Sequence, residues 1–248
     1  MIYTYDGSYE GLLTVVFETY RMRQSATEIV AADRYQERLF EQPIAIETDG
    51  ELAERVRAGL VRMGGDAADR LLYRVYLSEQ PELEAVIYHA VRRIMKEGAD
   101  ALQDYTDDLI LKAHQLDKKM GREVHRMHAF VRFQETQDGM YVAFIEPDFN
   151  VLPLIGEHFE DRYPAMHWLI YDVKRHYGLH YHEHHSEFTT FTERQHRIIS
   201  QDLLTDTEQD YQALWKTYFK SVDIPERRNL KLHYQHVPKR YWKWLVEK

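Results

Sequence analysis

The chain has 248 residues, no cysteine and a formal net charge of −9, from 32 basic and 41 acidic side chains. Without cysteine it cannot use disulfides, thiol catalysis, cysteine-ligated zinc or an iron–sulfur cluster of its own. No apolar run approaches the roughly 20 residues that span a bilayer, and the N-terminus lacks the regions of a secretory signal. We therefore expect a cytoplasmic protein that does not enter a membrane. The length suits one large domain or two small ones.

Residues 1–120 place apolar side chains mainly at helical spacing, which predicts a mostly helical part. Thr48 or Asp49 is suited to cap a helix, Ser8 is suited to cap an earlier one, and Gly64-Gly65 is a helix stop. The predicted elements are helices over Gly7–Arg23, Glu51–Met63, Asp66–Ser78 and Tyr105–Met120, a further helix that starts at Pro81, and a short strand at Pro43–Thr48.

From Gly121 onward the pattern changes to strands. The predicted strands are His128–Phe133, Met140–Glu146, His167–Asp172, Lys174–His182 and Glu187–Thr192, with a turn at Gln137–Gly139 and helices at Pro153–Tyr163 and Thr205–Tyr218. The fold class we predict is α+β: an N-terminal helical cap followed by a mainly antiparallel sheet flanked by helices. Its parts are residues 1–120 and 121–248, as two domains or as one continuous domain.

Charge is distributed unevenly along the chain. Residues 1–108 hold 12 bases and 21 acids, whereas residues 211–248 hold 9 bases and 3 acids. In this basic tail, cations alternate with Tyr and Trp, the combination that phosphate contact and base stacking require. The candidate nucleic-acid-binding residues are Arg227, Arg228, Lys231, Lys239, Arg240, Tyr241 and Trp242. The alternative is that the aromatic rings pack the tail onto the body while the bases stay hydrated.

A second group of polar residues surrounds the predicted hairpin. Glu146 and Asn150 lie where a strand passes into a loop, a setting in which sites commonly form. Arg132 lies on the other predicted strand and is a plausible ion-pair partner for Glu146. The alternative is a catalytic site in which Glu146 is the general base, Arg132 stabilises negative charge and Asn150 contributes a polar contact.

Five histidines fall within His176–His185. On one strand, His180, His182 and His184 share a face and provide imidazoles for a transition metal. Same-face neighbours are about 7 Å apart, which is awkward for a single ion, so a solvated hairpin is favoured over a metal site. The sequence has no phosphate-binding glycine loop, and we expect no cofactor.

Four blocks carry a resemblance to a known family: Tyr5–Leu13, Glu123–Glu135, Glu146–Ile155 and Trp215–Trp242. The chain resembles, in order from residue 3 to residue 247, a bacterial family named "probable DNA metabolism protein" that contains a domain of unknown function. The resemblance implies a genomic neighbour, a DNA modification or repair protein of the radical-SAM class. It also implies that the same domain is fused in some proteins to a uracil-DNA glycosylase-like domain.

Three functions remain open at this point. The leading one is a DNA-metabolism accessory protein that binds nucleic acid (single-stranded or damaged DNA) or a nucleotide and works with the radical-SAM partner. Because that partner needs a cysteine-held cluster and this chain has no cysteine, the radical chemistry must belong to the partner. The second is a hydrolase of a nucleic-acid base or phosphodiester that uses Glu146. The third is a scaffold whose acidic helical cap docks the partner without DNA affinity.

Overall fold

The computed structural model of the chain describes residues 1–38, 41–137, 139–190, 214 and 237–245. These residues fall into two units, Met1–Gly121 and Arg122–Lys248, and the division lies inside helix α5 (Asp108–Phe130). The predicted helix Thr205–Tyr218, apart from Leu214, lies outside the described residues. No helix among the described residues is long and apolar enough to cross a membrane.

The first unit contains a three-stranded parallel sheet, with β1 (Ile2–Tyr5) between β2 (Glu28–Ala31) and β3 (Ile44–Ala45). Helix α1 (Tyr9–Arg21) connects β1 to β2, as a parallel pair requires. The sequence predicted only the strand at β3. Strands of four residues are too short for a clear period, and three successive residues of β1 are buried, so β1 lacks the alternation that marks a half-exposed strand.

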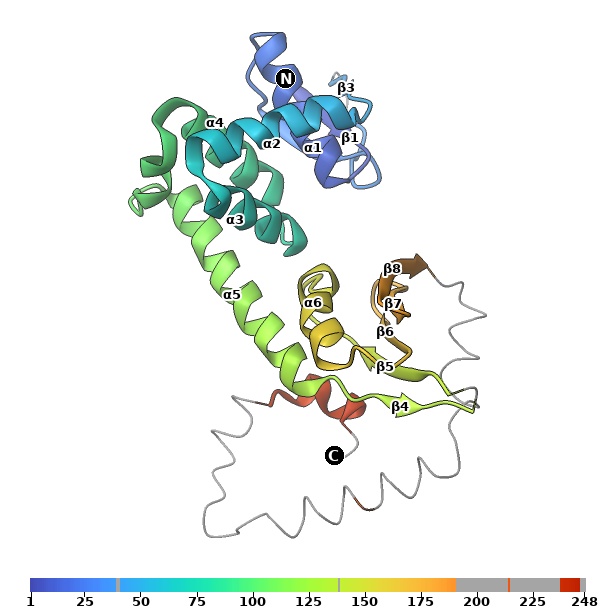
Figure 1. Ribbon diagram of the computed structural model, residues 1–248. Coiled ribbons are helices and arrows are strands. Elements are labelled where there is room, and N and C mark those ends of the chain that lie inside the picture. Colours follow the sequence, from blue (N-terminus) through green and yellow to red (C-terminus); the bar gives the residue numbers. More distant parts are fainter. Residues whose placement is uncertain (39–40, 138, 191–213, 215–236, 246–248) are drawn as a thin grey trace. The chain divides into compact units, whose positions relative to one another are not determined.

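Four helices of the first unit share one apolar core with this sheet (Figure 1). They are α1, α2 (Gly50–Gly64), α3 (Asp66–Leu77) and α4 (Leu83–Glu97). The predicted caps are confirmed: the Ser8 hydroxyl accepts from the Gly11 amide at 2.9 Å, and Asp49 accepts from the Glu51 and Leu52 amides. The local signals for helix start and stop therefore suffice for these helices.

Asp107 fastens α4 to the start of α5 after the 3₁₀ turn Gly98–Gln103. Its carboxylate accepts from the Leu109 and Ile110 amides, from Arg93 at 3.0 Å, and lies 2.6 Å from His89 Nε2. Burial opposes ionisation, but hydrogen bonds from His89, the Ile110 amide and Arg93 lower the pKa of Asp107 to about 2. The ionised carboxylate is thus the form that the fold stabilises.

We predict that Asp107→Asn lowers the free energy of unfolding at pH 7. The loss should shrink as pH falls from about 4 towards 2, because the folded pKa lies below the unfolded value and the stabilisation requires the charged form. Urea titrations of wild type and variant between pH 2 and 7 measure this. Asp108→Asn, at the exposed neighbouring position, is the control. A loss that stays constant with pH would contradict the assignment.

The second unit contains a five-stranded sheet in the order β4-β5-β6-β7-β8. Its strands are β4 (Gln134–Glu135), β5 (Tyr141–Ile145), β6 (Trp168–Asp172), β7 (Tyr177–His182) and β8 (His185–Thr190). All neighbours are antiparallel except β5 and β6, which are parallel and are connected through α6 (Leu152–Arg162). Gly156 brings α6 close to the sheet, since a Cβ there would lie 2.7 Å from the Leu179 side chain. The α+β class is confirmed.

The predicted strand His128–Phe133 is wrong. Helix α5 continues to Phe130, the Val131 amide still bonds to the Met127 carbonyl, and the strand pairing starts only at Gln134. A short apolar run does not distinguish a strand from a buried helix end. Here Met120 and Met127 are both buried seven residues apart, a spacing that belongs to one helix face.

Candidate functional site

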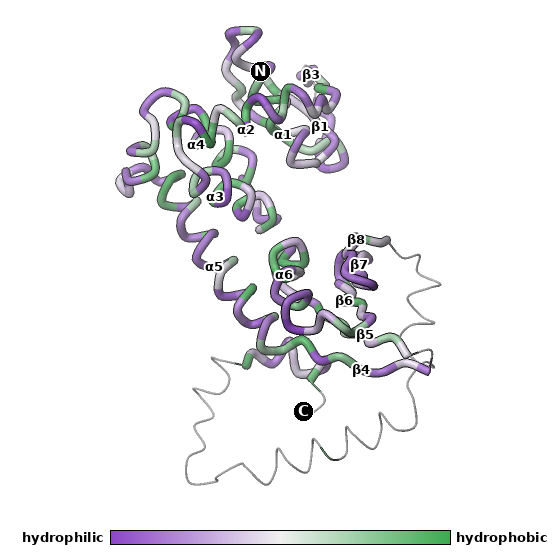
Figure 2. The backbone as a smooth tube through the Cα atoms, viewed as in Figure 1, coloured by the Kyte–Doolittle hydropathy of each residue, from purple (hydrophilic) through white to green (hydrophobic). Residues whose placement is uncertain are grey.

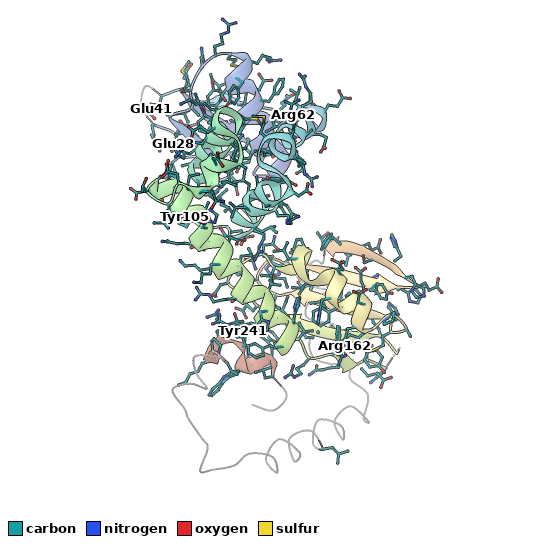
Figure 3. The ribbon with its side chains drawn as sticks, turned by 60° about the vertical axis from the view of Figure 1, so that its left-hand side comes forward. Glu28, Glu41, Arg62, Tyr105, Arg162 and Tyr241 are labelled. Carbon is teal, nitrogen blue, oxygen red and sulfur yellow. The ribbon has the colours of Figure 1, made fainter. Side chains whose placement is uncertain are left out.

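The described part of the basic tail is a 3₁₀ helix, Lys239–Trp244, in the second unit. With three residues per turn, its side chains fall into three rows: Lys239 with Trp242, Arg240 with Lys243, and Tyr241 with Trp244. Tyr241 is 2% exposed and lies 5.6 Å from the Phe130 ring, at the end of α5 (Figure 3). Trp244 stacks on Phe144 of β5 at 5.8 Å. The third row therefore packs the helix onto the unit.

The buried carboxylate of Glu123, 2% exposed, binds Arg240 of the second row and Tyr241 of the third row. It accepts from Arg240 Nη2 at 3.1 Å, from the Tyr241 hydroxyl, from Arg126 at 3.3 Å and from the Asp148 amide at 2.9 Å. Four donors use the lone pairs of both oxygens. Burial, together with this carboxylate, raises the pKa of Tyr241, so the phenol stays protonated as a donor. We call these groups the Glu123 clamp.

The loop that carries Asp148 is fastened from its other side by Arg175. This guanidinium donates to the Pro147 carbonyl at 3.3 Å and to the Asp148 carbonyl at 3.2 Å, and it pairs with buried Asp172 at 2.8 Å. Asp148 in turn pairs with Arg240 at 2.8 Å. The loop and the tail helix are therefore held by one set of charged contacts.

Two of the predicted nucleic-acid contacts thus have internal partners. Arg240 lies against two carboxylates, and Tyr241 has its ring in the interior instead of on an exposed stacking surface. The neighbouring Lys243 pairs with Glu146. The physical reason is the buried Glu123, which needs compensating donors and obtains them from the tail. Arg227, Arg228 and Lys231 lie outside the described residues.

The first row of the tail helix consists of Lys239 and Trp242. Lys239 is exposed, and its ammonium lies 6.0 Å from the centre of the half-buried Trp242 ring. The Trp242 indole N–H donates to the Val237 carbonyl at 3.1 Å, which fixes the plane of the ring. An ordered ring with a cation beside it can stack on a base and contact its phosphate.

Glu146, Asn150 and Arg132 each contact a different neighbour. Among the described residues Glu146 pairs with Lys243, not with Arg132, so the expected ion pair across the hairpin is wrong. Asn150 accepts from the Tyr177 hydroxyl, and Arg132 donates to the Ala129 carbonyl at 2.7 Å. Arg132 lies between the end of α5 and β4 and is not on a strand, which is why the expected pairing register fails.

The histidines divide between a strand and a turn. His180 and His182 lie on β7, coloured hydrophilic in Figure 2, but His184 lies in the β7–β8 turn with φ +63°. His167 takes its place, with its Nε2 2.7 Å from the Nε2 of His180. No group of three His, Asp or Glu side chains within the described ranges is arranged to hold a metal ion. The three histidines would share a face only if β7 continued to His184, but the strand ends at His182.

Sequence reasoning named Glu123 only as the start of a longer block and assigned no role to it or to Lys243. Glu123 stands three residues before Arg126 in a helix, a spacing typical of a surface ion pair. Its burial depends on contacts with the loop after β5 and with the tail, the latter more than a hundred residues further along the chain. No local signal identifies such a partner.

We predict that Glu123→Gln lowers the free energy of unfolding by about 3 to 5 kcal/mol, because the amide cannot compensate Arg240 and presents a donor to other donors. Tyr241→Phe, which removes one charge-assisted hydrogen bond, should cost about 2 kcal/mol. Urea denaturation measures both. Glu157→Gln, exposed on α6, is the matched control, and losses below about 1 kcal/mol in both clamp variants would refute the clamp.

A protein-family model described as a domain of unknown function, DUF4130, matches residues 81–247, which is more than half of the chain. No curated protein and no solved structure gives a significant match.

Proposed function

We propose a function for the chain, which belongs to the DUF4130 family: it is a DNA-metabolism accessory protein that binds nucleic acid. The observation that carries this proposal is the first row of the anchored tail helix, where the exposed Lys239 lies beside the half-buried, fixed ring of Trp242. The candidate residues Arg227, Arg228 and Lys231 belong to the same stretch of sequence, residues 211–248, which holds 9 bases and 3 acids.

Anchoring favours binding by this row. The Glu123 clamp and the Phe144–Trp244 contact hold the tail helix on the second unit before any ligand arrives. A ring that is already ordered loses little conformational entropy when a base stacks on it. Stacking tolerates any base, so this row suits binding of a single strand without strong sequence preference.

The hydrolase alternative has no comparable support. A general base must accept a proton from substrate or water, and the carboxylate of Glu146 is occupied by the ammonium of Lys243. Arg132, the proposed stabiliser of negative charge, donates to the Ala129 carbonyl at the end of α5. The contacts of these two residues favour a binding role for the unit over catalysis.

The proposal includes a radical-SAM partner, which supplies the cluster chemistry that a chain without cysteine cannot. The support for this partner is the resemblance to the DNA-metabolism family. The acidic first unit, with 12 bases and 21 acids over residues 1–108, is the part suited to dock it, because the basic tail is then left for nucleic acid.

We predict that Trp242→Ala weakens binding of a short single-stranded DNA by about tenfold, since stacking contributes roughly 1–3 kcal/mol per base. Lys239→Glu should weaken it several-fold. It should also reduce the slope of log affinity against log salt concentration by an amount that corresponds to about one phosphate contact. Fluorescence anisotropy at several salt concentrations measures both.

Arg162→Glu, exposed at the end of α6 in the same unit, is the matched charge control (Figure 3). Reversal at Arg227, Arg228 and Lys231 together should weaken binding further than Lys239→Glu alone. Unchanged affinity in Trp242→Ala and in the triple variant would remove the proposal.

For the partner, we predict that the full chain co-purifies with the neighbouring radical-SAM protein in a salt-sensitive complex. Glu51→Lys combined with Glu54→Lys, both on the exposed side of α2, should reduce recovery of the complex. The same reversal at Glu157 and Asp161 of the second unit is the control. If the control pair abolishes the complex, or if neither pair changes its recovery, the partner does not dock on the acidic first unit.

A further inference from the structure

A groove in the first unit, with a volume of about 780 Å³, lies between α1, β2 and α4. This volume falls within the range of small-molecule sites. Its lining includes Tyr20 of α1 and three residues at successive turns of α4, Tyr88, Arg92 and Lys96. The groove therefore combines aromatic rings with cations, and it belongs to a different unit from the tail helix.

Arg92 is the central side chain of the groove. Its Nη1 donates to the Ser25 hydroxyl at 2.8 Å and to the Tyr88 hydroxyl at 2.8 Å. The guanidinium carbon lies 5.8 Å from the Tyr20 ring centre and 5.4 Å from that of Tyr88. Within the part of the chain that the structure describes, no carboxylate forms an ion pair with Arg92. Its remaining N–H groups can face a ligand.

The neighbouring charges are paired differently. Arg93 is bound by Glu97 at 2.5 Å, Asp104 at 2.8 Å and Asp107 at 3.0 Å, so its charge is compensated. The acid at the opposite wall, Glu28, is held by both Nη atoms of Arg38. Lys96 lies 3.8 Å from Glu97 in an exposed pair, and Glu97 is itself bound by Arg93. The groove therefore presents the guanidinium of Arg92, with the exposed ammonium of Lys96 one turn further along α4.

Tyr88 is positioned as part of the wall. Its hydroxyl accepts from the Ala26 amide at 3.1 Å as well as from Arg92. Burial opposes ionisation of the phenol, but these donors together lower the pKa of Tyr88 below its usual value. The ring is thus held in place, and Tyr20, 48% exposed, is the ring available for stacking.

We propose that this groove binds a free mononucleotide, with the base stacked on Tyr20 and the phosphate held by Arg92 and Lys96. A guanidinium matches two phosphate oxygens at once, and the ammonium one turn further along α4 adds a second charge. The surrounding residues 1–108 carry 12 bases and 21 acids, which repel a polyanion but tolerate one phosphate. This ligand therefore differs from the strand assigned to the tail helix.

The test is isothermal titration calorimetry of the full chain with adenosine monophosphate, adenosine, inorganic phosphate and a 5′-phosphorylated ten-nucleotide single strand. Adenosine monophosphate should bind once per chain, at least tenfold more tightly than adenosine or phosphate. Arg92→Ala should weaken it about tenfold and Lys96→Ala about threefold. Tyr20→Ala should weaken both the nucleotide and adenosine.

Arg62→Ala and Tyr105→Ala are the controls, because Arg62 is exposed on α2 and Tyr105, 52% exposed, matches Tyr20 (Figure 3). The side chain of Lys96 is 82% exposed, so Lys96→Ala should leave the unit folded. This variant therefore tests the proposal even if Arg92→Ala destabilises the unit. Three results would overturn the proposal. Inorganic phosphate could bind as tightly as adenosine monophosphate, or the strand could bind more tightly than the nucleotide in a way that depends on Arg92. The third is that neither Arg92→Ala nor Lys96→Ala changes the affinity for the nucleotide. Lys239→Glu reports on the strand and Arg92→Ala on the nucleotide, so either proposal can fail alone.

Discussion

The carboxylate of Glu123 is a charge inside the second unit, and a charge there must be matched by donors or the unit loses stability. Its donors come from three places: its own helix, the loop after β5 and the tail helix. One buried group therefore determines where the loop lies and how the tail helix is oriented. It also decides which tail side chains face inward.

Among the described arginines discussed above, those paired with carboxylates differ from the one that could bind an external anion. Arg93, Arg175 and Arg240 each lie against carboxylates that their own unit supplies. Such cations are held in place and have little left to offer an external anion. Arg92 differs because its partners are two hydroxyls and two rings. The number of bases in a segment is therefore a poor guide to anion binding unless their partners are known.

The two proposals assign different ligands to the two units for the same physical reason. The first row of the tail helix belongs to a basic segment, and the proposal there is a strand held through many phosphates. The groove belongs to an acidic segment, where only a small ligand with one phosphate avoids strong repulsion. Both proposals use stacking on an aromatic ring, Trp242 in the tail helix and Tyr20 in the groove.

The sequence by itself determined the α+β class, the bounds of most helices and the cap at Ser8, and it narrowed a second cap to Thr48 or Asp49, because these depend on local spacing and on short side chains. It also showed the basic, aromatic tail. It did not determine the strands β1 and β2, the end of α5 or the turn at His184, since short segments satisfy several patterns equally well. Only the tertiary structure decided that Arg240 and Tyr241 face Glu123 and that Tyr20 and Arg92 meet in a groove. Those contacts join residues distant in sequence, and burial and charge pairing select them only when the chain is folded.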